Sequence, residues 1–488
     1  MPDPVLDAHR RDDGIYLLSG PRPISIRDQM LRGMLLVQRL IEAKILGVYS
    51  PLLVVGAGVG GATAAIEATR SGVETVLIEQ HQAPFMTLAA ARSRHVDPTQ
   101  YDWPLDHWYE GKFPWELSHT SMPFDFHPNT ADRLANLWTK TLLQHVAASH
   151  GRLTFRVNDR IRDGGITVDP DPRILPFKVN FESPRNEKYF GAIIWAAGFG
   201  NENCYIHDRT GTIPLYEGIK FWNTDSFTNL RSIVTDPKVL ISGGADGALQ
   251  DFLRIVTGKD TAKEIYTQCS IPDGIIHMLQ SAEDRAHRGL SWANAEDRAY
   301  RDKHELPYLV ELTNTHTAAV AIALSEPSVI PALDRLLVDP VPVTVVCWGP
   351  VLTPYYGLNR FLAMLIAEYI KRKFERETFL FDTLITEIEA ASSPAHTCLS
   401  WNHVMGRNAA SGSYAILSGA QHAVLIDPFC FGKDHLITFE RAGSAWKDTF
   451  NVVIVRHGRG ALPTPPGSAV TRELPPRPRH LWPYHIPY

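Results

Sequence analysis

The first long amphipathic pattern in the chain lies between residues 25 and 46. Its apolar side chains recur three or four positions apart, as they do on one face of an α-helix; they are Met30, Met34, Val37, Ile41 and Ile45. Ser25 and Asp28 are suitable N-terminal capping residues, and Gly47 is a suitable stop. We therefore predict a helix that packs its apolar face on the next part of the chain.

After Ser50 the pattern alternates between short apolar runs and helical spacing. Residues 51–80 predict strand, glycine turn, helix and second strand, in PLLVVGAGVGGATAAIEATRSGVETVLIEQ. We expect a helix in TADRLANLWTKTLLQHVAAS and a very apolar strand in YFGAIIWAAGFGNEN. Farther along, VLISGGADGALQDFL repeats strand, glycine turn and helix, and residues 259–335 have mainly helical spacing. The strand VPVTVVCWG and the helix GLNRFLAMLIAEYIKRKFERE then precede short alternating runs that extend to residue 458.

The first glycine turn, VVGAGVGGATAA, contains a complete GxGxxG between a strand and a helix. Gly56 permits the tight turn, Gly58 lets a diphosphate approach the backbone, and Gly61 lets the helix pack closely on the strand. The helix N-terminus offers free amides and a partial positive charge to the phosphates. The next strand ends at Glu79, where an acid can bind ribose hydroxyls. This order of features predicts a dinucleotide-binding unit.

From the strand GAIIWAAGFGNEN onward, the chain resembles the two-dinucleotide-domain flavoproteins, which include pyridine-nucleotide-dependent oxidoreductases and flavin monooxygenases. In that class the first GxGxxG binds the ADP half of FAD, and a later strand ends in Ala-Thr-Gly beside the cofactor. This chain has Ala196-Ala197-Gly198 there, so alanine replaces the threonine. In the class, a strand leading to a helix N-terminus closes the FAD domain near the flavin ring, and VTVVCWGPVLTPYYGLNRFLAMLI matches that role.

The resemblance implies an α/β fold with a Rossmann-like FAD domain, a second, remodelled dinucleotide-type domain and a small β-rich C-terminal domain. The residues that it implies for FAD binding are Gly56, Gly58, Gly60, Gly61, Glu79, Gln80, Arg92, Ala197, Gly198, Gly357, Leu358 and Asn359. We expect an N-terminal extension and helix at 1–49, the FAD domain at 50–236 and 337–378, the second, mainly helical glycine-turn domain at 237–336, the β-rich domain at 379–460 and a proline-rich tail at 461–488.

The second glycine turn, in VLISGGADGALQDFL, stands where the class has a turn for NAD(P)H. Ser242 replaces the leading glycine, and Asp246 brings a carboxylate that would repel a diphosphate unless it points away. No strand ending in an acid follows the helix soon afterwards. Two interpretations therefore stay open: NAD(P)H binding at Gly243, Gly244 and Gly247, or a structural or substrate-binding role.

Catalytic candidates gather after Glu79, in AARSRHVDPTQYDWPLDHWYEGKFPW. In proteins of the class that the chain resembles, the equivalent loop wraps the flavin. Arg92 and Arg94 are suited to anchoring a substrate carboxylate or the diphosphate, and His95 is suited to transferring protons near neutral pH. Tyr101 is the third catalytic candidate beside Arg94 and His95. The alternative is a lid whose aromatic side chains pack together and whose charges pair with each other.

Composition excludes several classes of function. The 488 residues, 44% hydrophobic and 21% charged, are ordinary for a soluble globular protein, and the net charge of -5 gives no reason to expect a nucleic acid or an acidic membrane as partner. The five cysteines lie far apart without a CxxC pair, which argues against a redox dithiol and a zinc site. The N-terminus lacks an apolar signal core, so we expect a cytoplasmic protein.

These observations favour an FAD-dependent oxidoreductase, a monooxygenase or oxidase, that acts on a small organic substrate. FAD would be reduced by NAD(P)H or directly by the substrate. We expect no metal, no nucleic acid and no membrane as partner, and the sequence leaves open a homo-oligomer. Two alternatives remain: a sensor or assembly protein that holds FAD or NAD without turnover, and an NAD-binding protein without flavin.

Overall fold

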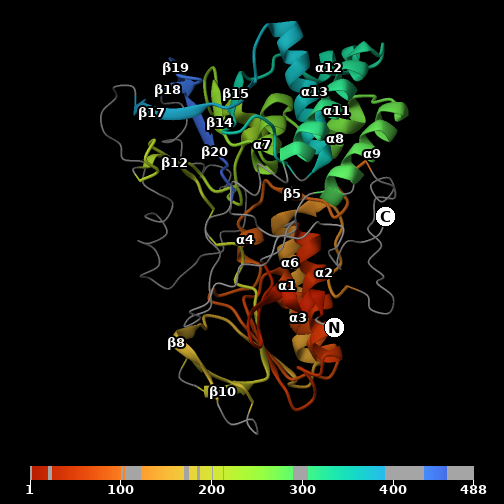
Figure 1. Cartoon of the computed structure of the whole chain (residues 1–488), viewed down its shortest axis with the longest axis vertical. Helices are drawn as coiled ribbons and strands as arrows, with labels where there is room; N and C mark the ends of the chain where they lie inside the picture. The colour runs from red at the N-terminus through yellow and green to blue at the C-terminus, as the bar shows by residue number, and fades with distance from the viewer. Residues whose placement is uncertain are drawn as a thin grey trace.

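The structure is a computed structural model that describes residues 3–19, 25–100, 103–104, 122–169, 175–183, 187–200, 202–212, 214–289, 306–354, 356–390 and 434–458. Two α/β units make up this part of the chain, the first in the lower half of Figure 1 and the second in the upper half. We call residues 3–200 the first unit and residues 238–458 the second unit. The segment between them contains a two-stranded hairpin, β12 (Tyr205–His207) and β13 (Pro214–Glu217), and a short 3₁₀ helix, η2 (Phe227–Ser232).

The first unit is built on a six-stranded sheet with the order β1-β2-β11-β3-β4-β7. Its strands are β1 (Arg10–Asp12), β2 (Ile15–Leu17), β3 (Leu52–Val55), β4 (Thr75–Ile78), β7 (Leu153–Arg156) and β11 (Ala192–Trp195). All neighbours pair in parallel except β1, which is antiparallel to β2. The parallel strands are apolar on both faces because both faces are covered.

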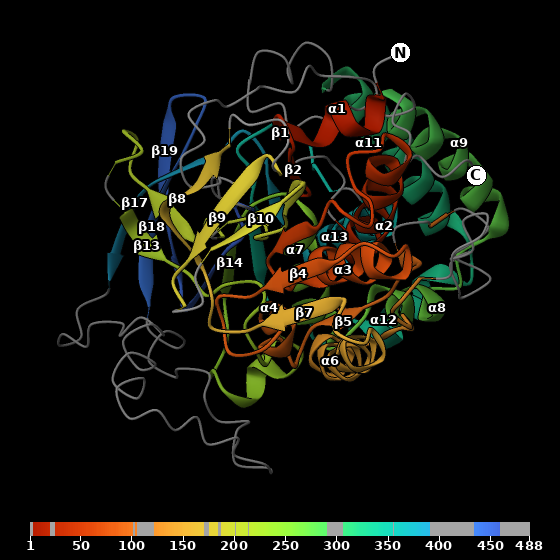
Figure 2. The ribbon, with the colours of Figure 1, turned by 90° about the horizontal axis from the view of Figure 1, so that it is seen from below.

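Helices cover one face of this sheet, and a second, antiparallel sheet covers the other. Leu52 and Val54 of β3 pack among the helices α2 (Ile26–Glu42), α3 (Val59–Arg70) and α6 (Ala131–Ala148). Leu53, between them, points to the opposite face. There it packs among side chains of β8 (Ile161–Val168), β9 (Phe177–Phe181) and β10 (Glu187–Phe190), as Figure 2 shows from below. Short elements complete the described part of the unit: α1 (Pro4–His9), α4 (Met86–Ala89), β5 (His95–Val96) and β6 (Asn129–Thr130).

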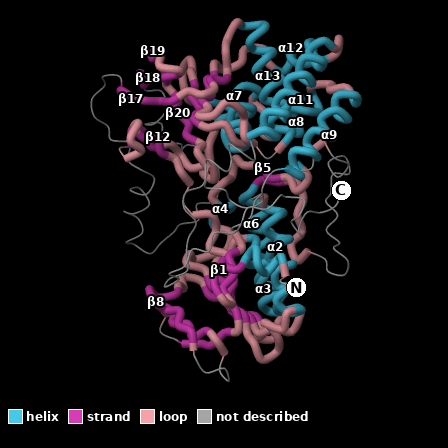
Figure 3. Tube along the Cα trace, viewed as in Figure 1, coloured by secondary structure: helices cyan, strands magenta, loops and turns pink. Residues whose placement is uncertain are grey.

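The second unit repeats this layering around a parallel sheet with the order β16-β15-β14-β20. The strands are β14 (Val239–Ser242), β15 (Val343–Val346), β16 (Phe379–Leu380) and β20 (Val452–Val455). Its helices are grouped on the right in Figure 3: α7 (Asp246–Thr257), α8 (Ala262–Gln268), α9 (Asp273–Gly289), α11 (Leu306–Ser325), α12 (Val329–Leu336) and α13 (Gly357–Phe374). The antiparallel strands β17 (Leu384–Ala390), β18 (His435–Arg441) and β19 (Ser444–Phe450) cover the opposite face of the sheet.

The structure corrects the expected domain organisation at two places. We expected residues 337–378 in the FAD domain, but β15 pairs with β14, so these residues belong to the second unit. We expected a β-rich C-terminal domain up to residue 460, and β17–β19 are that β-rich region, but β20 pairs with β14 in the second parallel sheet. The reason is the same in both cases: a buried parallel strand needs hydrogen-bonded neighbours, and those of β14 come from distant parts of the chain.

The predicted helix between residues 25 and 46 is α2, which packs against α3 beside the first glycine turn. Residues 259–335 are helical where the structure describes them, as predicted. No helix in the described ranges is long and apolar enough to cross a bilayer.

Candidate functional site: the first glycine turn

The three glycines of the first turn have different surroundings. Gly56 has a φ of 102°, and a Cβ there would collide with the backbone oxygen of Ala196 at the end of β11. A Cβ on Gly61 would collide with the Gly56 oxygen, so this glycine permits the close turn between β3 and α3. Gly58 differs, because a Cβ built on it meets no atom within 4 Å. The structure thus leaves open the space that a diphosphate would need.

Two groups with hydrogen-bonding capacity border this open space. Gly58 is the N-cap of α3 and brings no side chain to cap the helix, so the first amides of α3 have no intrahelical partners. The Glu79 carboxylate follows β4 and accepts hydrogen bonds from the Ala57 and His81 backbone amides, each at 2.9 Å. A carboxylate has about four acceptor positions, so Glu79 retains capacity for hydroxyl groups.

The sheet order places this turn at a topological switch point. From β3 the chain proceeds on one side to β4 and β7, whereas β11 lies on the other side of β3. In open α/β sheets, ligands bind in the crevice outside the carboxyl ends of the strands at such a point. Ala197 and Gly198 follow β11 at this edge, and Gly198 has a φ of 82° with no atom within 4 Å of an added Cβ.

An N-terminal strand and helix complete the same edge, and sequence reasoning missed them as part of the site. β2 lies beside β11, and the loop after it returns through Ser19, whose hydroxyl donates to the Gly198 oxygen at 2.8 Å. The first turn of α2 then lies against α3, where a Cβ on Gly60 would sit 3.1 Å from the Gln29 oxygen. Gln29 is 6% exposed, and its Nε2 has no hydrogen-bond partner among the described residues. Buried polar groups in proteins are usually hydrogen-bonded, so this amide is suited to donating a hydrogen bond to a polar ligand beside the glycine turn.

Residues Gly357, Leu358 and Asn359 do not contribute to this edge, which corrects our prediction. They begin α13 in the second unit, and Asn359 Nδ2 donates to Asp246 Oδ1 at 2.9 Å. We expected the strand before α13 to close the FAD domain, but the strand beside β11 is β2, and α2 follows it. A strand of three residues carries no periodic signal, so only its pairing with β11 reveals this role.

The glycines of the second turn lie close to other parts of the chain, as Gly56 and Gly61 do in the first turn. A Cβ on Gly244 would sit 2.9 Å from Cys347 Sγ, and one on Gly247 would sit 3.2 Å from the Phe221 ring. A Cβ on Gly243 would collide with the Arg456 oxygen. The absence of side chains at these glycines therefore allows neighbouring parts of the chain to pack against the turn.

The predicted catalytic residues do not form one group in the structure. Arg94 is 2% exposed and forms ion pairs with Asp225 and Asp251, which corrects the expectation that it binds substrate. Burial forces this outcome, because a buried guanidinium needs carboxylate partners. His95 is exposed on β5 and lines a cavity of about 180 Å³ that Arg254 and Lys263 also line. Tyr101 lies outside the described residues.

Other expected cofactor residues are exposed. The amide of Gln80 contacts the His81 ring at 3.2 Å, and the Arg92 backbone amide donates to Thr224 Oγ1 at the same distance. Among the described residues, no group of three or more His, Cys, Asp and Glu side chains is arranged to hold a metal ion.

Comparisons with known proteins agree with this geometry in the first unit. Residues 54–115 match the family of NAD(P)-binding Rossmann-like domains. No curated protein sequence matches the chain. Similar solved structures include bacillithiol disulfide reductase from Staphylococcus aureus, with 12% identity, a TM-score of 0.38 and coverage of 84% of this chain and 76% of that one. L-lysine 6-monooxygenase from Pseudomonas syringae has 10% identity, a TM-score of 0.34 and coverage of 86% and 83%. OTEMO in complex with FAD and NADP has 10% identity, a TM-score of 0.35 and coverage of 85% and 72%.

The matched residues contain β3, the GxGxxG turn, α3, β4 and Glu79, which together border the open space described above. The two parallel sheets, each with a glycine turn after a strand, confirm the predicted fold class. The chain thus has two α/β units, each with a glycine turn after a parallel strand, and residues 54–115 match the family of NAD(P)-binding Rossmann-like domains.

Proposed function

We propose that the protein is an FAD-dependent oxidoreductase that binds its flavin dinucleotide at the first glycine turn. The observation that carries the proposal is the open space at Gly58, which faces the free amides of α3. Gln29, which lies beside Gly60, adds a buried Nε2 donor that has no partner among the described residues. The preference for FAD over NAD rests on the resemblance carried by the first turn and Ala196-Ala197-Gly198.

The residues present fit such a dinucleotide. The amides of α3 would hold the diphosphate, Glu79 would accept hydrogen bonds from ribose hydroxyls, and Gln29 would donate to a polar group of the ligand. Ala197 and Gly198 would keep the end of β11 narrow enough for the dinucleotide to pass. When bound, FAD supplies hydride transfer, and the protein supplies binding, orientation and exclusion of water.

The finer activity that we propose is that of a monooxygenase or oxidase acting on a small organic substrate. The described cysteines support a reaction without a dithiol, because Cys204, Cys269 and Cys347 are buried and unpaired. Burial raises the pKa of the Cys204 thiol to about 11 and the pKa values of the Cys269 and Cys347 thiols to about 12. His95 is the proposed proton-transfer residue, since its exposed imidazole lines the cavity between the units. NAD(P)H as the reductant remains part of this proposal.

The test is an anaerobic titration of the purified protein, followed by its visible absorption spectrum. We expect a flavin spectrum that is bleached by substrate or by NADH or NADPH and that returns when oxygen is admitted. A flavin that no reductant bleaches would favour the sensor or assembly role. A colourless protein that FAD cannot reconstitute, but that NAD stabilises against unfolding, would contradict the proposal.

A further inference from the structure

The surroundings of the second glycine turn come from both units of the chain. Asp246, at the start of α7, accepts hydrogen bonds from the Tyr356 amide at 3.2 Å and from Asn359 Nδ2 at 2.9 Å. Gln100 of the first unit donates from Nε2 to Asn359 Oδ1 at 3.1 Å. The Asp246 carboxylate is therefore bonded to the start of α13, and Asn359, one of its two donors, is also contacted by a side chain of the first unit.

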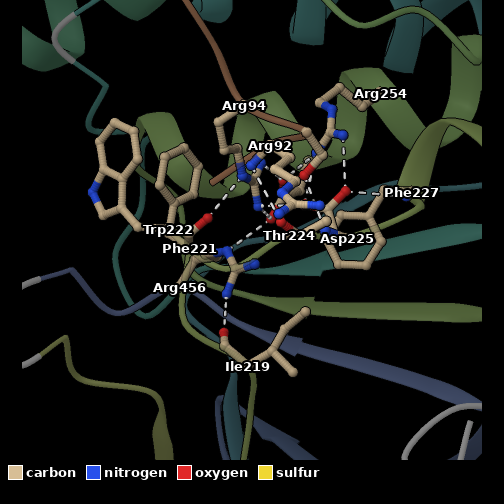
Figure 4. Close-up of polar contacts among 12 residues, drawn as sticks. Arg92, Arg94, Ile219, Phe221, Trp222, Thr224, Asp225, Phe227, Arg254 and Arg456 are labelled. Carbon is tan, nitrogen blue, oxygen red and sulfur yellow. Dashed lines mark hydrogen bonds and ion pairs between the residues drawn. The ribbon is translucent and has the colours of Figure 1, made fainter. Parts of the chain in front are cut away.

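Beside the same turn, Arg94 of the first unit enters a buried ionic cluster. We define this cluster by five residues: Arg94, Asp225, Asp251, Arg254 and Arg456. Figure 4 shows the guanidinium groups of Arg94 and Arg254 converging on Asp225. Arg94 Nη2 lies 2.9 Å from Asp225 Oδ2, and Arg254 Nη2 lies 2.8 Å from Asp225 Oδ1.

Asp251 of α7 is the second anion of the ionic cluster. Arg94 Nη1 pairs with Asp251 Oδ1, and Arg456, directly after β20, donates from Nε to Asp251 Oδ2 at 2.7 Å. Burial alone would raise the pKa of Asp251, but the guanidinium groups of Arg94 and Arg456 hold it below its ordinary value. The carboxylate is thus ionised and bonded to both units at once.

Phe221 links the ionic cluster to the glycine turn. A Cβ on Gly247 would sit 3.2 Å from its ring, so a larger residue there would displace the ring slightly. The guanidinium groups of Arg94 and Arg456 lie 3.9 Å and 5.7 Å from the centre of the ring (Figure 4). The glycines at 243 and 247 therefore make room for the residues that join the two units.

We propose that the ionic cluster beside the second glycine turn holds the two units in one orientation throughout the reaction. The inference does not depend on which dinucleotide the first turn binds. It follows from burial and charge: Arg94 of the first unit pairs with Asp251 of α7, so the ionic cluster loses a buried partner if the units separate.

The proposal is tested by measuring the distance between the two units with pulsed electron paramagnetic resonance. Nitroxide labels are placed at Arg70→Cys, at the end of α3, and Lys371→Cys, near the end of α13, because both residues are exposed. The background carries Cys398→Ser and Cys430→Ser, two positions outside the described residues, while the other three cysteines are buried. The protein is measured with its bound cofactor, alone and after anaerobic addition of NADH or NADPH.

We expect one narrow distance distribution that neither nucleotide changes. Arg94→Met should broaden it, whereas Arg39→Met, which removes an exposed ion pair with Glu42, should not. A second distance in the unmutated protein, or a shift on adding NADH or NADPH, would overturn the proposal. So would an Arg94→Met protein that folds and keeps the narrow distribution. If Arg94→Met does not fold, the distribution of the labelled protein with intact Arg94 still decides between one orientation and several.

Discussion

The guanidinium of Arg94 lies 3.9 Å from the centre of the Phe221 ring, and its Nε donates to the Phe221 backbone oxygen at 2.7 Å. One arginine of the first unit therefore holds both the side chain and the backbone of the segment that leads into the second unit. Its remaining nitrogens pair with Asp225 and Asp251. The role of Arg94 is to join the units, which explains why a residue with suitable chemistry for substrate binding is buried.

Arg94→Met should lower the free energy of unfolding by about 3 kcal/mol or more, because it leaves two buried carboxylates with fewer partners. Urea denaturation at neutral pH measures this change. Arg39→Met is the matched control, with an expected change below about 1 kcal/mol, since the Arg39–Glu42 pair is exposed. Equal effects of the two substitutions would contradict a structural role for the ionic cluster.

Gly58→Asp should abolish dinucleotide binding without destabilising the protein. Asp is a favourable N-cap residue, and its carboxylate next to the free amides of α3 should keep the unfolding free energy equal or raise it by up to about 1 kcal/mol. The same carboxylate would fill the open space and repel a diphosphate. We expect FAD affinity, measured by isothermal titration of the apoprotein, to fall at least about 100-fold, or about 2.7 kcal/mol.

Gly274→Asp is the control for this substitution. Gly274 lies in the first turn of α9, and a Cβ there also meets no atom within 4 Å. The variant carries the same change of charge and should bind FAD as the unmodified protein does. If both variants retain FAD, the first glycine turn is not the binding site.

Gln29→Leu should separate ligand binding from folding. Leucine removes a buried amide nitrogen that has no partner among the described residues, so the apoprotein should become more stable by about 1 kcal/mol. FAD affinity should fall about tenfold, because the ligand loses a donor. Gln38→Leu, on the same helix, removes a hydrogen bond of 3.0 Å to Glu67 and should lower stability while sparing affinity. The reverse pattern would exclude Gln29 from the site.

Stability should fall as the pH is lowered below about 6.5, and His9 should account for part of this loss. Burial lowers the pKa of His9 to about 3, so the folded protein excludes a proton that the unfolded chain binds near its ordinary pKa. The contribution is fully present above the unfolded pKa and decreases by about 1.4 kcal/mol per pH unit down to the folded pKa. His9→Gln should reduce this slope in urea denaturation between pH values of about 6.5 and 4.

His127→Gln, which replaces an exposed histidine, is the control for the pH experiment. It should leave the dependence of stability on pH unchanged. An unaltered slope in His9→Gln would mean that His9 binds its proton equally well in the folded and unfolded states.

Local signals predicted the elements around the first glycine turn well. The GxGxxG turn, its flanking strands and Glu79 lie within thirty residues, and each step of that pattern depends on near neighbours in the chain. The capped helix at Ser25 was also predicted, since its apolar spacing and its capping residues are local. The deviation of the second glycine turn from GxGxxG, at Ser242 and Asp246, was also visible because it is local. In the structure, Asp246 accepts hydrogen bonds from other parts of the chain.

The features that sequence reasoning missed depend on pairing between distant segments. β2 has three residues, and its position beside β11 follows from hydrogen bonds to residues near 194. β15 was assigned to the wrong unit because its neighbour β14 lies beyond a long helical insertion. Arg94 was misinterpreted because its burial is set by Asp225 and Asp251, and a charged residue in a polar segment gives no sign of such partners.

The placement of β20 has a consequence for the order in which the chain folds during synthesis. This strand pairs with β14 at the edge of the second sheet, so β14 lacks one of its two neighbours until residues 452–455 have left the ribosome. Arg456 follows directly, and it delivers the last cation to Asp251. Until then one edge of β14 is exposed and Asp251 lacks one of its guanidinium partners. An exposed strand edge favours chaperone binding and aggregation. Synthesis of β20 and Arg456 therefore completes both the second parallel sheet and the ionic cluster.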